Sequence, residues 1–233
     1  MGNSNLFFNA YIQADLFGKT IFLTLFILSI VTWVIIIHKS KIIRKTRRLM
    51  IISNTIFNKQ QNNPLTSLNI PQTKRNILNS IHSLIRKYTI NILNKNCSQT
   101  SHNHLSKADI DFIDLNCSSH ISQEIALLDK NLFILSIITS LAPFLGLLGT
   151  VWGILITFSG LQTYGFSQDS SVILSGLSTA LTTTVLGLLI AIPALIGYSC
   201  LKHVIKDIEK ESERFSTILL TIIEMQYRKT DLS

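Results

Sequence analysis

Residues 132–163 read LFILSIITSLAPFLGLLGTVWGILITFSGLQT, a run of 32 residues without an Asp, Glu, Lys, Arg or His. As an α-helix this run measures about 48 Å, because each residue adds about 1.5 Å, whereas the hydrocarbon core of a bilayer is about 30 Å thick. An uncharged run of this length is typical of a transmembrane helix, because a helix satisfies its own backbone hydrogen bonds in lipid. This stretch therefore decides the fold class.

Two further uncharged runs lie elsewhere in the chain, at residues 20–37 and 171–201, and they contain 18 and 31 residues. The 233-residue chain is 47% hydrophobic and 15% charged, with a mean hydropathy of +0.37. A soluble domain carries about 25% charged residues. We therefore predict an all-α integral membrane protein with three transmembrane helices, and we do not expect an enzyme.

The run at 20–37 is interpreted as a membrane anchor that is retained. A helix of 18 residues measures about 27 Å, which is just enough to cross the hydrocarbon core. A signal peptide would carry its basic residues before the apolar stretch, whereas here they follow it. The residues that follow are Lys39, Lys41, Arg44, Lys45, Arg47 and Arg48.

The distribution of basic residues predicts the orientation in the membrane. Of the 21 Lys and Arg residues, 1 lies in residues 1–37, 14 lie in 38–130, none lies in 164–170 and 6 lie in 202–233. The positive-inside rule then places the N-terminus and the 164–170 turn outside, and the 38–130 region and the C-terminus in the cytoplasm. The net charge of +8 has the same explanation, so we expect no nucleic-acid partner.

The runs also divide the chain into segments. We predict an outer N-terminal segment (1–19), transmembrane helix 1 (20–37), a cytoplasmic helical region (38–130), a core of transmembrane helices 2 and 3 (131–201) and a cytoplasmic C-terminal helix (202–233). Because the second and third runs exceed what a bilayer needs even with tilt, both helices are expected to extend into the cytoplasm.

Apolar residues continue at helical spacing beyond both long runs. Upstream, Ser106 and Asp109 have the spacing of a capping box at the start of a helix. A polar loop is predicted at 58–73, followed by a short amphipathic helix that begins near Ile77. The apolar stripes are Ile110, Ile113, Cys117, Ile121, Ile125 and Leu128 upstream, and Val204, Ile208, Phe215, Leu219 and Ile222 downstream.

The three cysteines, Cys97, Cys117 and Cys200, form no CxxC pair, so we expect reduced thiols. Three histidines lie near the first two cysteines, but their spacing fits none of the usual zinc patterns. We therefore expect no metal site, no cofactor and no catalytic residue. These histidines are His102, His104 and His120.

Small and hydroxyl-bearing residues are concentrated in the two long runs. Eight of the 15 residues from 170 to 184 are Ser or Thr. Small residues let helices approach closely, and hydroxyls bond across helices or to their own backbone, so packing alone is one interpretation. The candidate packing and shaping residues are Gly146, Gly149, Gly153, Gly187, Pro143 and Pro193.

The second interpretation is a narrow polar path that holds water, because a hydroxyl both donates and accepts hydrogen bonds and supports proton transfer without carrying charge. The density of hydroxyls favours this interpretation. Neither long run contains an acid that holds a proton, so a proton path would need an acid from a partner. The candidate path residues are Thr150, Thr157, Thr179, Thr183 and Thr184.

Three motifs carry a resemblance to a known family. Residues 141–154 read LAPFLGLLGTVWGI, residues 180–188 read ALTTTVLGL and residues 191–194 read AIPA. Together they resemble the proton-channel family of TolQ, ExbB and MotA, and the similarity is specific over residues 122–200. The first span and the basic residues after it look more like TolQ than ExbB.

The resemblance implies a homo-oligomer of the bacterial inner membrane, a pentamer in this family. Its second and third spans would surround the single-span helices of a dimeric TolR-like or ExbD-like partner, which supplies a membrane aspartate. A TolA-like or TonB-like protein is a further candidate partner. By motif position, Thr150 and Thr184 correspond to the pore-facing threonines of the family. Thr179 stands where many relatives carry Glu, which puts a Glu-assisted proton exit in question.

The function expected from the resemblance is that of a stator, which converts proton-motive force into work on the cell envelope as in a Tol-Pal-like system. An ExbB-like energiser of uptake across an outer membrane and a non-conducting membrane scaffold are the alternatives. A small-solute transporter is disfavoured, because the sequence shows no inverted repeat.

Overall fold

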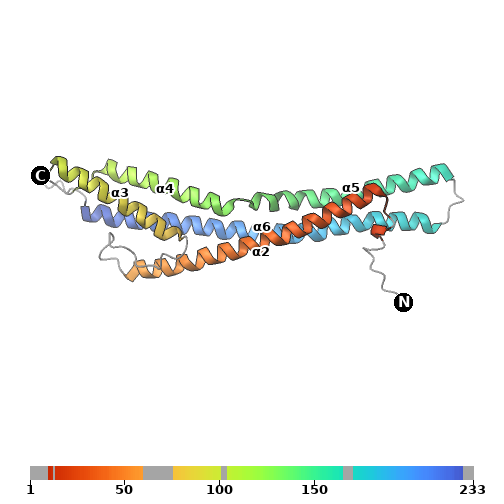
Figure 1. The fold of residues 1–233 in the computed structure, drawn as a ribbon, viewed down its shortest axis with the longest axis horizontal. Coiled ribbons are helices and arrows are strands. Elements are labelled where there is room, and N and C mark those ends of the chain that lie inside the picture. Colours follow the sequence, from red (N-terminus) through yellow and green to blue (C-terminus); the bar gives the residue numbers. More distant parts are fainter. Residues whose placement is uncertain (1–9, 13, 60–75, 101–103, 165–169, 228–233) are drawn as a thin grey trace. The chain divides into compact units, whose positions relative to one another are not determined.

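The computed structural model of this chain describes residues 10–12, 14–59, 76–100, 104–164 and 170–227. These residues form helices and no β-strand, which confirms the all-α prediction. Figure 1 shows the long helices in chain order. They are α2 (Leu16–Lys59), α3 (Ile77–Thr100), α4 (Lys107–Asp129), α5 (Leu132–Tyr164) and α6 (Ser170–Tyr227).

Three of these helices contain segments that are long and apolar enough to cross a membrane. These segments are Leu16–Phe57, Leu132–Gly160 and Gly176–Tyr227. The prediction of three membrane-spanning helices is thus confirmed, and the chain is a membrane protein. The exact bounds given above for each span and region stay a prediction.

The chain divides into two compact units, and the first consists of Met1–Lys39 and Asn131–Cys200. Its core joins the first half of α2 to α5 and α6. Three of the seven core residues are alanines, whose small size lets helix backbones approach closely. Because lipid tails are as apolar as leucine, helices in a membrane associate mainly through such close packing. The buried core residues are Ile21, Leu25, Ile138, Ala142, Ile190, Ala191 and Ala194.

The outward faces of α5 and α6 in this unit are apolar. Phe144, Val151, Val185 and Leu189 are each more than half exposed. Exposed apolar surface on this scale is typical of a face that contacts lipid or another chain.

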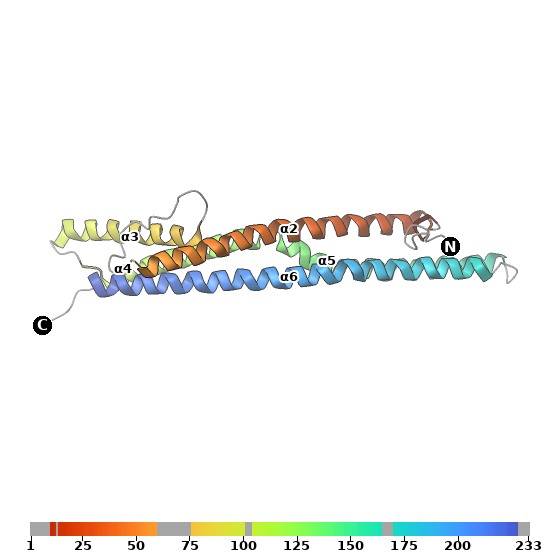
Figure 2. The same ribbon diagram turned by 90° about the horizontal axis from the view of Figure 1, so that it is seen from below.

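The second unit consists of Ser40–Lys130 and Leu201–Ser233. Within it α3 and α4 lie side by side, as Figures 1 and 2 show from two directions. The predicted capping box is present, because the Ser106 side chain accepts from the Asp109 backbone and the Asp109 side chain accepts from the Ser106 backbone. The Ser106 bonds outweigh the effect of burial and hold the pKa of Asp109 below its usual value.

The predicted apolar stripes form the core of the second unit. On α3 the helix begins at Ile77, as predicted, and the predicted loop at 58–73 lies mostly outside the described residues. Phe57 and Phe215 pack edge to face with ring centroids 4.8 Å apart. The buried stripe residues are Ile113, Cys117, Ile121 and Ile125 on α4, and Ile208, Phe215 and Leu219 on α6.

The two long apolar runs differ in what adjoins them on the side expected to be cytoplasmic. The third run continues without interruption, because α6 extends to Tyr227. The second run begins at a break, where Lys130 caps α4 and Asn131 adopts a left-handed conformation with φ of 72°. Asparagine tolerates this conformation better than most residues. The upstream stripe therefore lies on α4, a separate helix.

Burial gives the cysteines of the second unit different reactivities. Cys117 is buried and its sulfur accepts a hydrogen bond of 3.0 Å from Ser216, whereas Cys97 is exposed. Burial raises the pKa of the Cys117 thiol, a shift that the Ser216 bond only reduces and that nearby Asp114 increases. Since the thiolate is the nucleophile, Cys117 should alkylate at least about tenfold more slowly than Cys97 at pH 8.

Iodoacetamide labelling of two variants that each retain one of these thiols measures the difference. Replacement of the other two cysteines by serine leaves Cys97 alone in one variant and Cys117 alone in the other. Equal labelling rates in the folded protein would contradict the packing of α4 against α6.

Candidate functional site

The candidate site begins at a close contact between α5 and α6. A Cβ atom added to Gly187 would lie 2.5 Å from the Ala142 carbonyl oxygen, and one added to Gly153 would lie 2.6 Å from the Ala180 Cβ. On Gly146 it would lie 2.9 Å from the Thr183 carbonyl oxygen. These positions leave no room for a side chain, so the small residues bring the two backbones together.

Two hydroxyls bridge the helices at this contact. Thr183 and Thr184 on α6 each donate to the carbonyl oxygen of Gly146 on α5, with O···O distances of 3.2 Å. The single Thr183 hydroxyl proton is shared with the Ala180 carbonyl at 2.7 Å, and the Thr183 side chain lies where a Cβ on Gly149 would collide. Glycine at 146 and 149 is thus what allows these threonines to reach the α5 backbone.

Two of the other predicted hydroxyls, both on α5, bond within that helix. Thr150, which is buried, donates to the Leu147 carbonyl at 2.7 Å. Thr157 donates to the Gly153 carbonyl at 2.8 Å. A hydroxyl whose proton is engaged in this way still has lone pairs that accept a hydrogen bond from water.

A cavity of about 290 Å³ lies beside the contact in the first unit. Of the predicted path residues, Thr157, Thr179 and Thr183 line it, whereas Thr150 and Thr184 are outside the set of lining residues. The structure thus gathers three of the five threonines around one space. Glycines 18, 149, 153, 160 and 176 also line the cavity.

Both predicted prolines lie inside helices that continue through them, Pro143 in α5 and Pro193 in α6. A proline lacks the backbone N–H that would bond to the carbonyl one turn earlier, so each helix loses one internal hydrogen bond. Both prolines are partly buried in the first unit.

The structure adds a carboxylate that the sequence did not single out. Asp15 lines the cavity, and its Oδ2 accepts a hydrogen bond of 3.0 Å from the indole Nε1 of Trp152. Its Oδ1 accepts a bond of 3.0 Å from the backbone N–H of Gly18. The Phe17 ring packs against Trp152 with centroids 4.4 Å apart.

These contacts favour the ionised form of the Asp15 carboxyl. Burial acts to raise its pKa, but the Trp152 bond and the backbone bonds outweigh it and hold the pKa below its usual value. One signal in the sequence pointed to this residue, because an acid immediately before an apolar helix favours the helix N-terminus. Asp169, which the sequence places in the outer turn, lies outside the described residues.

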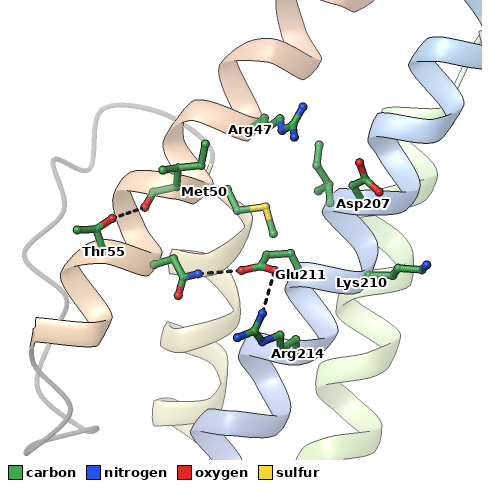
Figure 3. Close-up of a pocket in the computed structure, with 10 residues that line it drawn as sticks. Arg47, Met50, Thr55, Asp207, Lys210, Glu211 and Arg214 are labelled. Atoms are coloured by element: carbon green, nitrogen blue, oxygen red, sulfur yellow. Dashed lines mark hydrogen bonds and ion pairs between the residues drawn. The ribbon is translucent and has the colours of Figure 1, made fainter.

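A second cavity, of about 610 Å³, lies in the other unit between α2 and α6. Figure 3 shows charged side chains of both signs around it. Asn54 donates to Glu211 at 2.8 Å, and Arg214 lies 4.0 Å from the same carboxylate. Glu211 and Arg214 lie three positions apart on α6, so this exposed pair belongs to one helix, and the Asn54 bond is the contact between α2 and α6.

Comparison with known proteins bears on the first of these sites. The sequence profile of the MotA/TolQ/ExbB proton channel family matches residues 85–214, which is more than half of the chain. The matched range includes every path and packing residue predicted from the sequence. Asp15 lies outside it.

Individual proteins of two kinds are similar to the chain. The biopolymer transport protein ExbB of Helicobacter pylori (strain J99) is 51% identical over 74 residues, which cover 32% of this chain and 50% of that protein. ExbB of Aquifex aeolicus is 41% identical over 80 residues, covering 34% and 53%. The Tol-Pal system protein TolQ of Haemophilus influenzae is 34% identical over 106 residues, covering 45% and 46%. The chain spans about half the length of the curated relatives it matches.

Proposed function

The chain belongs to the MotA/TolQ/ExbB proton channel family, and we propose that it acts as the channel subunit of a stator that couples proton-motive force to work on the cell envelope. One observation carries this proposal. Inside the uncharged runs of α5 and α6, the hydroxyls of Thr183 and Thr184 meet a backbone carbonyl beside a cavity that three threonines help to line. Hydroxyls and carbonyls at membrane depth are what a path for water and protons needs. The proposed role is mechanical and involves no enzymatic reaction.

The proposed path depends on a partner for its acid. Residues 132–163 and 171–201 contain no Asp, Glu, Lys, Arg or His, and a proton pathway usually includes an intramembrane acid. We propose that a dimeric, single-span TolR-like or ExbD-like protein supplies an aspartate beside Thr150 and Thr184. The chain would surround it as a homo-pentamer, a proposal that the exposed apolar faces of α5 and α6 support. A TolA-like or TonB-like protein would receive the motion.

The energy available is sufficient for such work. Each proton that crosses a membrane potential of 100 mV releases about 2.3 kcal/mol. A few protons per step therefore bias a protein rearrangement by several kcal/mol.

Proton flux into liposomes that hold the chain with its partner tests the proposal. Flux that follows an imposed potential supports a stator. A correctly assembled complex without any flux would instead support the non-conducting scaffold.

The orientation that we propose has its own test. With the N-terminus outside the cytoplasmic membrane, the 164–170 turn is periplasmic and the 38–130 region is cytoplasmic. In a variant without native cysteines, Ser167→Cys should react with an impermeant maleimide in intact spheroplasts, and Ser67→Cys should react only after lysis. The reverse pattern would contradict both the orientation and the stator.

The driven process is proposed to be Tol-Pal-like. The similarity to TolQ of Haemophilus influenzae extends over 106 residues and supports this choice. The higher identity to the ExbB of Helicobacter pylori supports an ExbB-like energiser of uptake as the second candidate. Expression in one strain that lacks TolQ and in another that lacks ExbB separates the two, with envelope integrity and outer-membrane uptake as the respective readouts.

A further inference from the structure

We infer that Asp15 is a fixed anion at the outer mouth of the hydroxyl-lined cavity, where it raises the local proton concentration and favours cations over anions. This inference rests on the proposed function, because it names the group that delivers protons to that path. The outer position follows from the proposed orientation, in which the residues before the first span are periplasmic.

The geometry places this carboxylate in the cavity wall. Asp15 lines the cavity of about 290 Å³ together with Thr157, Thr179 and Thr183. The indole N–H of Trp152 on α5 donates a hydrogen bond of 3.0 Å to Asp15, which lies 137 positions earlier in the sequence. The carboxylate is therefore held against α5 at the cavity and does not simply cap its own helix.

Among the described residues of the first unit, few charged side chains accompany Asp15. It is the sole Asp or Glu among the described residues of the first unit, and neither α5 nor α6 contributes an Asp, Glu, Lys, Arg or His to that unit. Lys19, one turn further along α2, does not line the cavity. His38 and Lys39 lie about 35 Å further along α2 by helix rise, well beyond the screening length of about 8 Å at physiological salt.

The hydrogen bonds explain why a fixed charge is proposed here and not a proton store. Because the pKa of Asp15 is held below its usual value, the carboxyl is ionised at neutral pH and becomes neutral only in acid. Such a group does not hold a proton at neutral pH, so it acts through its charge. An anion in a cleft walled by apolar helices raises the local concentration of cations, and this effect weakens as salt increases.

The test measures proton flux in liposomes that contain the chain and its partner, at low and at high ionic strength. Asp15→Asn keeps the size of the side chain and one acceptor oxygen but removes the charge. We expect it to lower flux about fivefold at 10 mM salt and to differ little from wild type at 1 M salt, where the screening length falls to about 3 Å. Asp15→Lys should lower flux further, and Asp15→Glu should retain most of it.

The matched control is Asp129→Asn, which removes a carboxylate that pairs with Lys202 in the other unit. It should leave flux unchanged at both ionic strengths. If Asp15→Asn conducts like wild type at 10 mM salt, the inference is wrong. If Asp15→Asn and Asp15→Glu lose flux equally at both salt concentrations, Asp15 has a structural role only. A wild-type complex without flux would instead defeat the proposed function itself.

Discussion

Reconstituted in liposomes without a partner, this chain should assemble and yet conduct very few protons. A proton that crosses about 30 Å of hydrocarbon needs continuous water or a titratable group on the way. The two long helices offer neither a carboxylate nor an imidazole between residues 132 and 163 or between 171 and 201. Asp15 lies before the first span and so supplies charge at one end of the path only.

Addition of the single-span partner should restore flux, and this is the largest effect that we expect. A pH-sensitive dye inside the liposomes records proton uptake under an imposed potassium diffusion potential. Exchange of the partner's membrane aspartate for asparagine should remove the flux, while size-exclusion chromatography shows an intact complex. Selective proton conduction by this chain alone would contradict the division of roles, because the path would then be complete without a borrowed acid.

The charge pattern predicted where the second and third long apolar helices begin. The last charged residues before the two long runs are Lys130 and Asp169, and α5 and α6 begin at Leu132 and Ser170. The first run ends at Ile37, whereas α2 continues to Lys59. Charge marks the limit of the bilayer and not that of the helix, and Lys and Arg are good helix formers. The three motifs also identified the family, which the profile match confirms.

Residue spacing in the sequence could not predict which side chains contact each other within the site. Spacing predicted that Gly146 and Gly153 allow close approach, but the rotation of α5 about its axis decides that Thr183 and Ala180 are what they meet. The bond between Asp15 and Trp152 joins residues 137 positions apart, and no periodicity reports such a pair. The roles of the five threonines remain predictions.

Thr184→Val and Thr150→Val should each preserve assembly and lower proton flux of the complex at least about tenfold, equivalent to about 1.4 kcal/mol in the barrier. Valine matches threonine in shape but neither donates nor accepts a hydrogen bond. The Thr184 hydroxyl bridges to the Gly146 carbonyl of α5, and Thr150 is buried one turn further along that helix. The corresponding serine variants retain the hydroxyl and should lose less flux.

Thr139→Val is the matched control, because Thr139 lies on the same helix as Thr150 and makes the same kind of bond. Its hydroxyl donates to the Ser136 carbonyl at 2.7 Å, as that of Thr150 does to Leu147, and Thr139 is partly buried. Loss of an intrahelical bond by itself therefore predicts equal effects at 139 and 150, whereas a hydroxyl path predicts loss of flux at 150 alone. If all three valine variants conduct like wild type, the hydroxyls serve helix packing, and the scaffold becomes the better interpretation of these two helices.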